Sequence, residues 1–130
     1  MKGLEERIRL CADSFDVRGN TFTGAGWDKI LADVKKSPWI LIGEDHMTNE
    51  IPEFVSKIVE KNRFDAFFCE IDPLTSSLLE KHCLNSKSEL RKRHAETLSF
   101  YSLEPEYRLV QQFVRSKARI CGTDQILIIS

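Results

Sequence analysis

A carboxylate and an imidazole follow a short apolar run in the first half of the chain. The run is Trp39-Ile40-Leu41-Ile42, Gly43 ends it, and Glu44, Asp45 and His46 come next. In extended chain, Glu44 and His46 point to the same side with Cα atoms about 6.5 Å apart. A carboxylate and an imidazole placed in this way can share a metal ion, a proton or a water molecule.

Two further acids, Glu70 and Asp124, each follow an apolar run that is typical of a buried strand. Parallel strands of one sheet bring their carboxyl ends to the same edge, where open α/β sheets bind their ligands. One cluster of catalytic candidates is therefore expected at this edge: Glu44, His46, Glu70 and Asp124. Each acid alone is more often a helix cap or a solvated loop residue, but the joint pattern favours a site.

Three strands must position these residues, and we expect them near 39–43, 65–71 and 118–122. A helix with an apolar stripe is expected between the first two strands, so that 39–71 forms a βαβ unit with parallel strands. Further helices are predicted over 4–16 and 27–36 and from Pro105 onward, and the glycine-rich residues 16–26 are predicted to form a loop.

A more polar helical insertion, residues 74–98, is expected after the second strand. Ser77 and Glu80 can form a capping box at the start of a helix there, and Ser86 with Glu89 can form a second. The other two histidines, His82 and His94, lie in these polar helices and are predicted to be surface residues. The fold class expected is α/β, with a parallel sheet of three or four strands flanked by helices.

Composition limits the classes of partner. The 130 residues predict a single α/β domain, and the net charge of −1 with 30% charged residues of mixed sign favours neither nucleic acid nor a membrane surface. No apolar run approaches the ~20 residues that span a bilayer. The N-terminal residues do not resemble a signal peptide. The four cysteines form no C-x-x-C pair, so we expect reduced thiols in a cytoplasmic protein.

The motifs and their order resemble the erythromycin esterase superfamily. They are G-E-D-H after the first expected strand, F-F-C-E-I-D-P after the second and I-C-G-T-D after the third. The same superfamily includes the haem-binding ChaN-like lipoproteins and, more distantly, the Tiki/TraB proteins with their G-x-x-H signature. The resemblance covers residues 27–124 and implies an α/β sheet with a helical insertion after the second strand.

The resemblance also implies roles for the site residues. In esterase-like members, the position of His46 corresponds to a general base that activates water beside a carboxylate. In Tiki-like members, the same positions hold a divalent metal such as Mn, Co or Zn, which here gives His46, Glu44 and Glu70 as ligands. The implied activity is hydrolysis of an ester or amide in a small-molecule substrate. A non-catalytic module that binds haem, a metal or another ligand and an inactive copy remain as alternatives.

Members of the superfamily usually extend well beyond the length of this chain, so we expect the N-terminal part of a larger domain. The sequence finishes with the apolar run 126–129. Burial of apolar surface is worth roughly 25 cal/mol per Å², so exposure of this run would be costly. It is expected either to form a fourth strand or to be covered, by the N-terminal helix or by another copy in a homo-oligomer.

Overall fold

The computed structural model describes residues 3–43, 48–85, 90 and 98–124. The chain divides into two compact units, residues 1–42 and 43–130 (called unit 1 and unit 2), and each is described by itself. A division into compact units does not decide whether the two fold as one domain, so the single-domain prediction stays a prediction. Within the described residues, no helix has the length and apolar character needed to cross a membrane.

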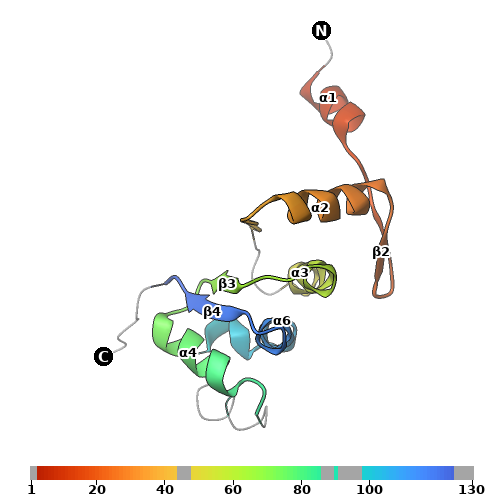
Figure 1. Cartoon of the computed structure of the whole chain (residues 1–130). Helices are drawn as coiled ribbons and strands as arrows, with labels where there is room; N and C mark the ends of the chain where they lie inside the picture. The colour runs from red at the N-terminus through yellow and green to blue at the C-terminus, as the bar shows by residue number, and fades with distance from the viewer. Residues whose placement is uncertain (1–2, 44–47, 86–89, 91–97, 125–130) are drawn as a thin grey trace. The chain divides into compact units, whose positions relative to one another are not determined.

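Unit 1 combines two helices with a small hairpin (Figure 1). Its elements are α1 (Leu4–Cys11), β1 (Asp16–Arg18), β2 (Thr21–Thr23) and α2 (Ala25–Lys36). The prediction of a loop over 16–26 is wrong for the hairpin, in which β1 and β2 pair antiparallel. Strands of three residues are too short to show the alternation of apolar and polar residues from which a strand is predicted. The turn between them begins at Gly19, whose φ of +57° is easy only for glycine.

Three aromatic rings hold the hairpin against α2. The rings contact one another in a triangle, with centroids 5.7 Å apart for Phe15 and Phe22, 5.0 Å for Phe22 and Trp27 and 6.2 Å for Phe15 and Trp27. Trp27 is the most buried of the three, with 5% of its surface exposed. Gly26 permits the close approach, because a Cβ there would lie 2.8 Å from the backbone oxygen of Ser14. This aromatic cluster is the core of unit 1.

The strand predicted near 39–43 is absent, and this part of the sequence interpretation is wrong. Residues 39–43 form no helix or strand, and the side chain of Leu41 is 99% exposed. The predicted βαβ unit over 39–71 therefore does not form through this segment. A run of four apolar residues indicates a strand only if a neighbouring strand supplies hydrogen bonds, and the sequence cannot show that neighbour.

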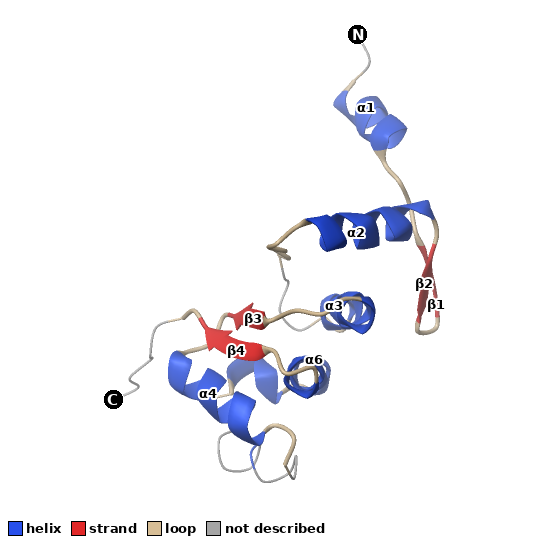
Figure 2. Ribbon diagram, in the orientation of Figure 1, coloured by secondary structure: helices blue, strands red, loops and turns tan. Residues whose placement is uncertain are grey.

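Unit 2 contains a two-stranded parallel sheet and its helices (Figure 2). The elements in chain order are α3 (Glu50–Lys61), β3 (Ala66–Cys69), α4 (Pro73–His82), η1 (Ser99–Ser102), α6 (Glu104–Arg115) and β4 (Arg119–Gly122). The second and third predicted strands are confirmed as β3 and β4, and the predicted helices before and between them are confirmed as α3 and α6. The fold is mixed α/β, and a third or fourth parallel strand is not confirmed.

β3 and β4 pair in parallel, with Phe67 beside Ile120 and Cys69 beside Gly122. The connection between them passes through α4, η1 and α6, and α4 packs along β4. Asp72, not Ser77, caps α4, so the predicted capping box over Ser77 and Glu80 is wrong. The carboxylate of Asp72 accepts hydrogen bonds from the backbone N–H groups of the first turn, and Pro73 occupies the first helical position, where proline is tolerated.

The core of unit 2 lies where α4 and α6 meet the sheet. Its most deeply buried large side chains come from both helices and from the connection between them: Tyr107, Leu79, Leu98, Val110 and Cys83. Phe67 of β3 stacks on Phe113 of α6 with ring centroids 4.3 Å apart and planes 4° from parallel. The apolar spacing along α6 is thus explained by burial against the sheet.

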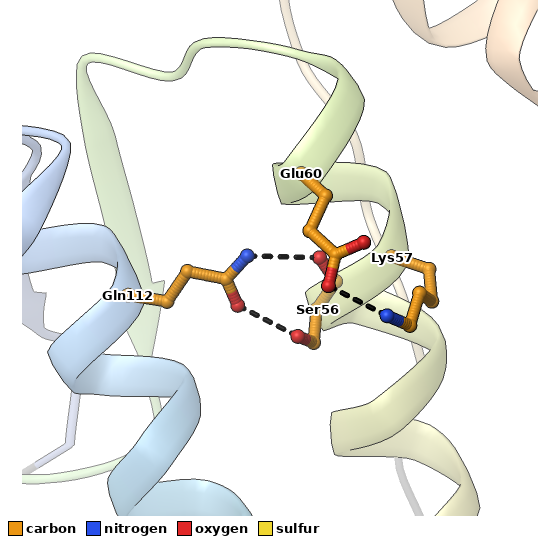
Figure 3. Close-up of polar contacts among 4 residues, drawn as sticks. All are labelled: Ser56, Lys57, Glu60 and Gln112. Carbon is orange, nitrogen blue, oxygen red and sulfur yellow. Dashed lines mark hydrogen bonds and ion pairs between the residues drawn. The ribbon is translucent and has the colours of Figure 1, made fainter. Parts of the chain in front are cut away.

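α3 is joined to α6 by a reciprocal pair of hydrogen bonds (Figure 3). Ser56 Oγ donates to Gln112 Oε1 over 2.7 Å, and Gln112 Nε2 donates to the backbone oxygen of Ser56 over 3.0 Å. On the same turn of α3, Lys57 Nζ pairs with Glu60 over 2.6 Å. The two polar helix faces are therefore matched at a specific register, which apolar packing alone does not impose.

Candidate functional site

Two of the predicted site residues lie just after the two parallel strands. Glu70 comes after β3 and Asp124 lies two residues after β4. Because β3 and β4 are parallel, both acids lie beyond the carboxyl ends of the strands, which we call the carboxyl edge. Both are exposed. The structure thus brings Glu70 and Asp124 to one edge of one sheet.

Backbone hydrogen bonds continue the pairing past the strand ends and fix this edge. The backbone N–H and the hydroxyl of Thr123 both donate to the carbonyl oxygen of Cys69, each over 3.0 Å. The N–H of Asp124 then donates to the carbonyl oxygen of Ile71, also over 3.0 Å. These bonds fix the backbone on both sides of Glu70 and at Asp124 itself.

Gly122 is required where the chain after β3 passes over β4. A Cβ at this position would lie 2.5 Å from the carbonyl oxygens of both Ile71 and Asp72, too close for any side chain. Steric space therefore explains why the residue before Thr123 and Asp124 is a glycine. It lets the segment that begins α4 lie directly against the end of β4.

Asp72 is a third acid near this edge, but its carboxylate is already committed to α4. Its Oδ1 accepts from the N–H groups of Leu74 at 2.8 Å and Thr75 at 3.0 Å, and its Oδ2 accepts from the Thr75 hydroxyl at 2.5 Å. Partial burial raises the pKa of Asp72, but the hydrogen bonds from Thr75 and Leu74 outweigh it and leave the pKa below its ordinary value of 3.8. This carboxylate is a helix cap rather than a general acid.

The other predicted site residues, Glu44 and His46, lie outside the described residues, as does Asp45 between them. Their expected place beside Glu70 and Asp124 stays a prediction. Unit 2 begins at Gly43 in the chain. His82 is exposed near the end of α4, as predicted, whereas His94 lies outside the described residues.

The described residues alone do not make a metal centre. Among them, no group of three or more His, Cys, Asp or Glu side chains is arranged to hold a metal ion. Carboxylate oxygens such as those of Glu70 and Asp124 suit Mn²⁺ or Zn²⁺, but two carboxylates are fewer than the three protein ligands common in catalytic zinc sites. A metal at this edge would therefore need at least one further ligand, such as Glu44 or His46.

The three cysteines whose side chains are described are free thiols: Cys69, Cys83 and Cys121. Cys69 is buried and Cys121 is half-buried. Burial raises the pKa of Cys83 to about 11, although the nearby charge of Arg115 opposes this. A thiol with such a pKa is protonated at neutral pH, so Cys83 is a core residue rather than a nucleophile.

Besides the Asp72 cap, sequence reasoning missed two features of unit 2. One is Glu106 on α6, which is 9% exposed and whose Oε2 has no hydrogen-bond partner among the described residues. An acid in the first turn of a helix is usually solvated and interacts favourably with the helix dipole. Nothing in the sequence therefore indicated that Glu106 would be buried. The other is an open hollow lined by residues 60–63 and 115–117. Its two segments are too distant in sequence to be read as one surface.

No protein-family model, curated protein or solved structure matches the chain. The resemblance to the erythromycin esterase superfamily therefore rests on the short motifs and their order alone.

Proposed function

We propose that unit 2 belongs to an erythromycin-esterase-like hydrolase, which cleaves an ester or amide of a small molecule with water at the carboxyl edge. The observation that supports this proposal is the pairing of β3 with β4, which leaves Glu70 and Asp124 at one edge. In the resemblance, Glu70 and Asp124 correspond to the acids that follow the second and third strands. The larger sheet of three or four parallel strands typical of the superfamily would extend this pair.

His46 acts as the general base or as a metal ligand in this proposal. Glu44 and Glu70 are its carboxylate partners, and Asp124 is the acid on the neighbouring strand. A carboxylate beside an imidazole favours the protonated ring and strengthens it as a base. A divalent metal would instead need the neutral ring, and it would supply an activated water.

Thermal unfolding with and without Mn²⁺, Co²⁺ or Zn²⁺ separates the two roles of His46. If His46 binds metal, the ion raises the melting temperature of the wild type, His46→Ala abolishes the rise and Glu70→Ala weakens it. The matched control is His82→Ala, which removes an exposed histidine from α4. Equal shifts in the wild type, His46→Ala and His82→Ala would remove the metal from the proposal.

Hydrolysis of chromogenic esters and amides tests the activity itself. The proposal expects turnover that His46→Ala and Glu70→Gln reduce by at least about a hundredfold, the usual contribution of a general base, while His82→Ala does not. Metal binding that depends on His46 without turnover of any substrate would contradict the hydrolase and leave a binding module.

A further inference from the structure

An open hollow lies at the opposite side of unit 2 from the proposed site. It is lined by residues 60–63, at the end of α3 and beyond it, and by residues 115–117, at the end of α6 and beyond it. These segments precede β3 and β4, so the hollow lies at the amino ends of the strands. It is widely open to solvent and has a volume of about 530 Å³. We call it the basic hollow.

Four of its seven lining residues are cations: Lys61, Arg63, Arg115 and Lys117. The single acid is Glu60, whose carboxylate is turned to Lys57 of the same helix at 2.6 Å (Figure 3). In the part of the chain that the structure describes, none of the four cations forms an ion pair. Cations elsewhere in unit 2 do pair, as Arg108 does with Glu104 at 2.7 Å.

The ordinary reason for cations at a helix C-terminus does not account for this cluster. Such residues can hydrogen-bond the last carbonyl groups and favour the negative end of the helix. Here uncharged side chains already make such bonds, because Asn62 Nδ2 donates to Ile58 O at 2.9 Å and Ser116 Oγ donates to Phe113 O at 2.8 Å. All four cations are exposed.

Lys117 gives a second indication that charge matters here. Its φ of +67° is the left-handed conformation in which helices usually end with glycine. A lysine at this position costs about 1 kcal/mol or more relative to glycine in backbone strain. A cation therefore occupies the one position of the hollow where the backbone favours a residue without a side chain.

We propose that the basic hollow binds the polyphosphate group of a small ligand, such as a free polyphosphate or a nucleoside triphosphate. Two guanidinium groups and two ammonium groups suit an anion of several charges with many acceptor oxygens, because each cation can donate a charge-assisted hydrogen bond. A single carboxylate would use only part of this set. The site is independent of the proposed hydrolytic edge.

The test is isothermal titration of the intact protein with inorganic tripolyphosphate and with ATP, without magnesium, at 150 mM salt. The variant Lys61→Gln with Lys117→Gln removes two cations from the hollow. The matched control, Lys35→Gln with Lys36→Gln, removes two exposed lysines from the last turn of α2 in unit 1. All four positions are exposed, so both variants are expected to fold, and circular dichroism verifies this.

Tripolyphosphate should bind the wild type and the control alike, and the hollow variant should bind at least about tenfold more weakly. Equal affinity of ATP and tripolyphosphate would identify the phosphates as the whole ligand, whereas tighter ATP binding would identify a nucleotide. If both double variants bound tripolyphosphate equally weakly, the loss of affinity would be due to the net charge of the protein alone, and the proposal would be overturned. It would also be overturned if the wild type bound neither tripolyphosphate nor ATP.

Discussion

The carboxylate of Glu80 on α4 accepts a hydrogen bond from the backbone N–H of Ile120 in β4, over 2.8 Å. In the parallel pair, Arg119 donates its N–H to Asp65 before β3, so the N–H of the next residue points away from β3. Glu80 thus covers a donor on the outer edge of β4 that would otherwise be free to pair with another chain. Its second oxygen lies 3.4 Å from the guanidinium of Arg119.

Glu80→Ala should therefore lower the free energy of unfolding by about 1–3 kcal/mol, because it leaves a partly buried backbone donor without its charged acceptor. Urea unfolding measures this change. Glu60→Ala is the control, since it removes a side-chain pair with Lys57 within α3, worth about 0.5 kcal/mol, and no bond to the backbone. Equal effects of the two substitutions would show that the bond to Ile120 contributes nothing beyond a surface charge.

The Asp72 cap gives the stability of unit 2 a defined dependence on pH. Because hydrogen bonds lower the pKa of the folded carboxyl below 3.8, its ionised form stabilises the fold above that pH. The contribution is lost as pH falls through the lower, folded pKa. Asp72→Asn keeps an acceptor for the helix but does not titrate. The free energy of unfolding of the wild type minus that of the variant should therefore be constant near neutral pH and decrease in acid.

Guanidinium unfolding of the two proteins between pH 7 and pH 3 checks this dependence. Asp72→Ala, which removes the acceptor altogether, should cost about 1 kcal/mol at neutral pH. A difference between wild type and Asp72→Asn that grows as the pH falls would have the wrong sign and would contradict the assigned cause.

Sequence periodicity predicted the helices of unit 2 well because their apolar stripes are buried. α6 buries Leu109, Val110 and Phe113, and these are the positions that a helix of 3.6 residues per turn places on one side. The strand near 39–43 had no such check, since four consecutive apolar residues carry no period. Because this strand is absent, the expected crossover between it and β3 is absent as well.

The candidate site also has parts that the sequence predicted and parts that it did not. The sequence shows the two apolar runs that form β3 and β4, and each acid follows one of them. The parallel pairing of these strands then places Glu70 and Asp124 at the same edge of the sheet. The cap at Asp72 was missed because Asp-Pro after a strand reads as a turn, although the same pair also begins helices. The basic hollow needed tertiary structure, because only the packing of α3 on α6 brings residues 60–63 beside residues 115–117.

Cys83 should be the slowest of the described thiols to react. It is 0% exposed and its pKa is about 11, so at pH 8 about one thiol in a thousand would be ionised even without steric protection. Cys121 is half-buried and should be alkylated first. Mass spectrometry after timed exposure to iodoacetamide, in a Cys11→Ser background, measures the order. Modification of Cys83 as fast as that of Cys121 would show that the α4–α6 contact opens readily.

Lys117 allows the strain of the backbone and the charge of the basic hollow to be separated. The end of α6 has the hydrogen bonds of a glycine-type helix end, with Ala118 N donating to Phe113 O and Lys117 N to Val114 O, both over 3.0 Å. Lys117→Gly should raise the free energy of unfolding by about 0.5–1 kcal/mol, because relief of strain exceeds the entropy that glycine adds to the unfolded chain. Lys117→Ala keeps the strain and should leave stability within about 0.5 kcal/mol of the wild type.

Both substitutions remove the same cation, so both should weaken tripolyphosphate binding by the same factor despite their different stabilities. Urea unfolding and titration of the three proteins give the two quantities independently. If Lys117→Gly stabilised the fold and left binding unchanged, the ammonium group would have no part in the basic hollow. If Lys117→Gly destabilised the fold, the lysine side chain itself would support the end of α6, and the strain at φ +67° would not be the dominant effect at this position.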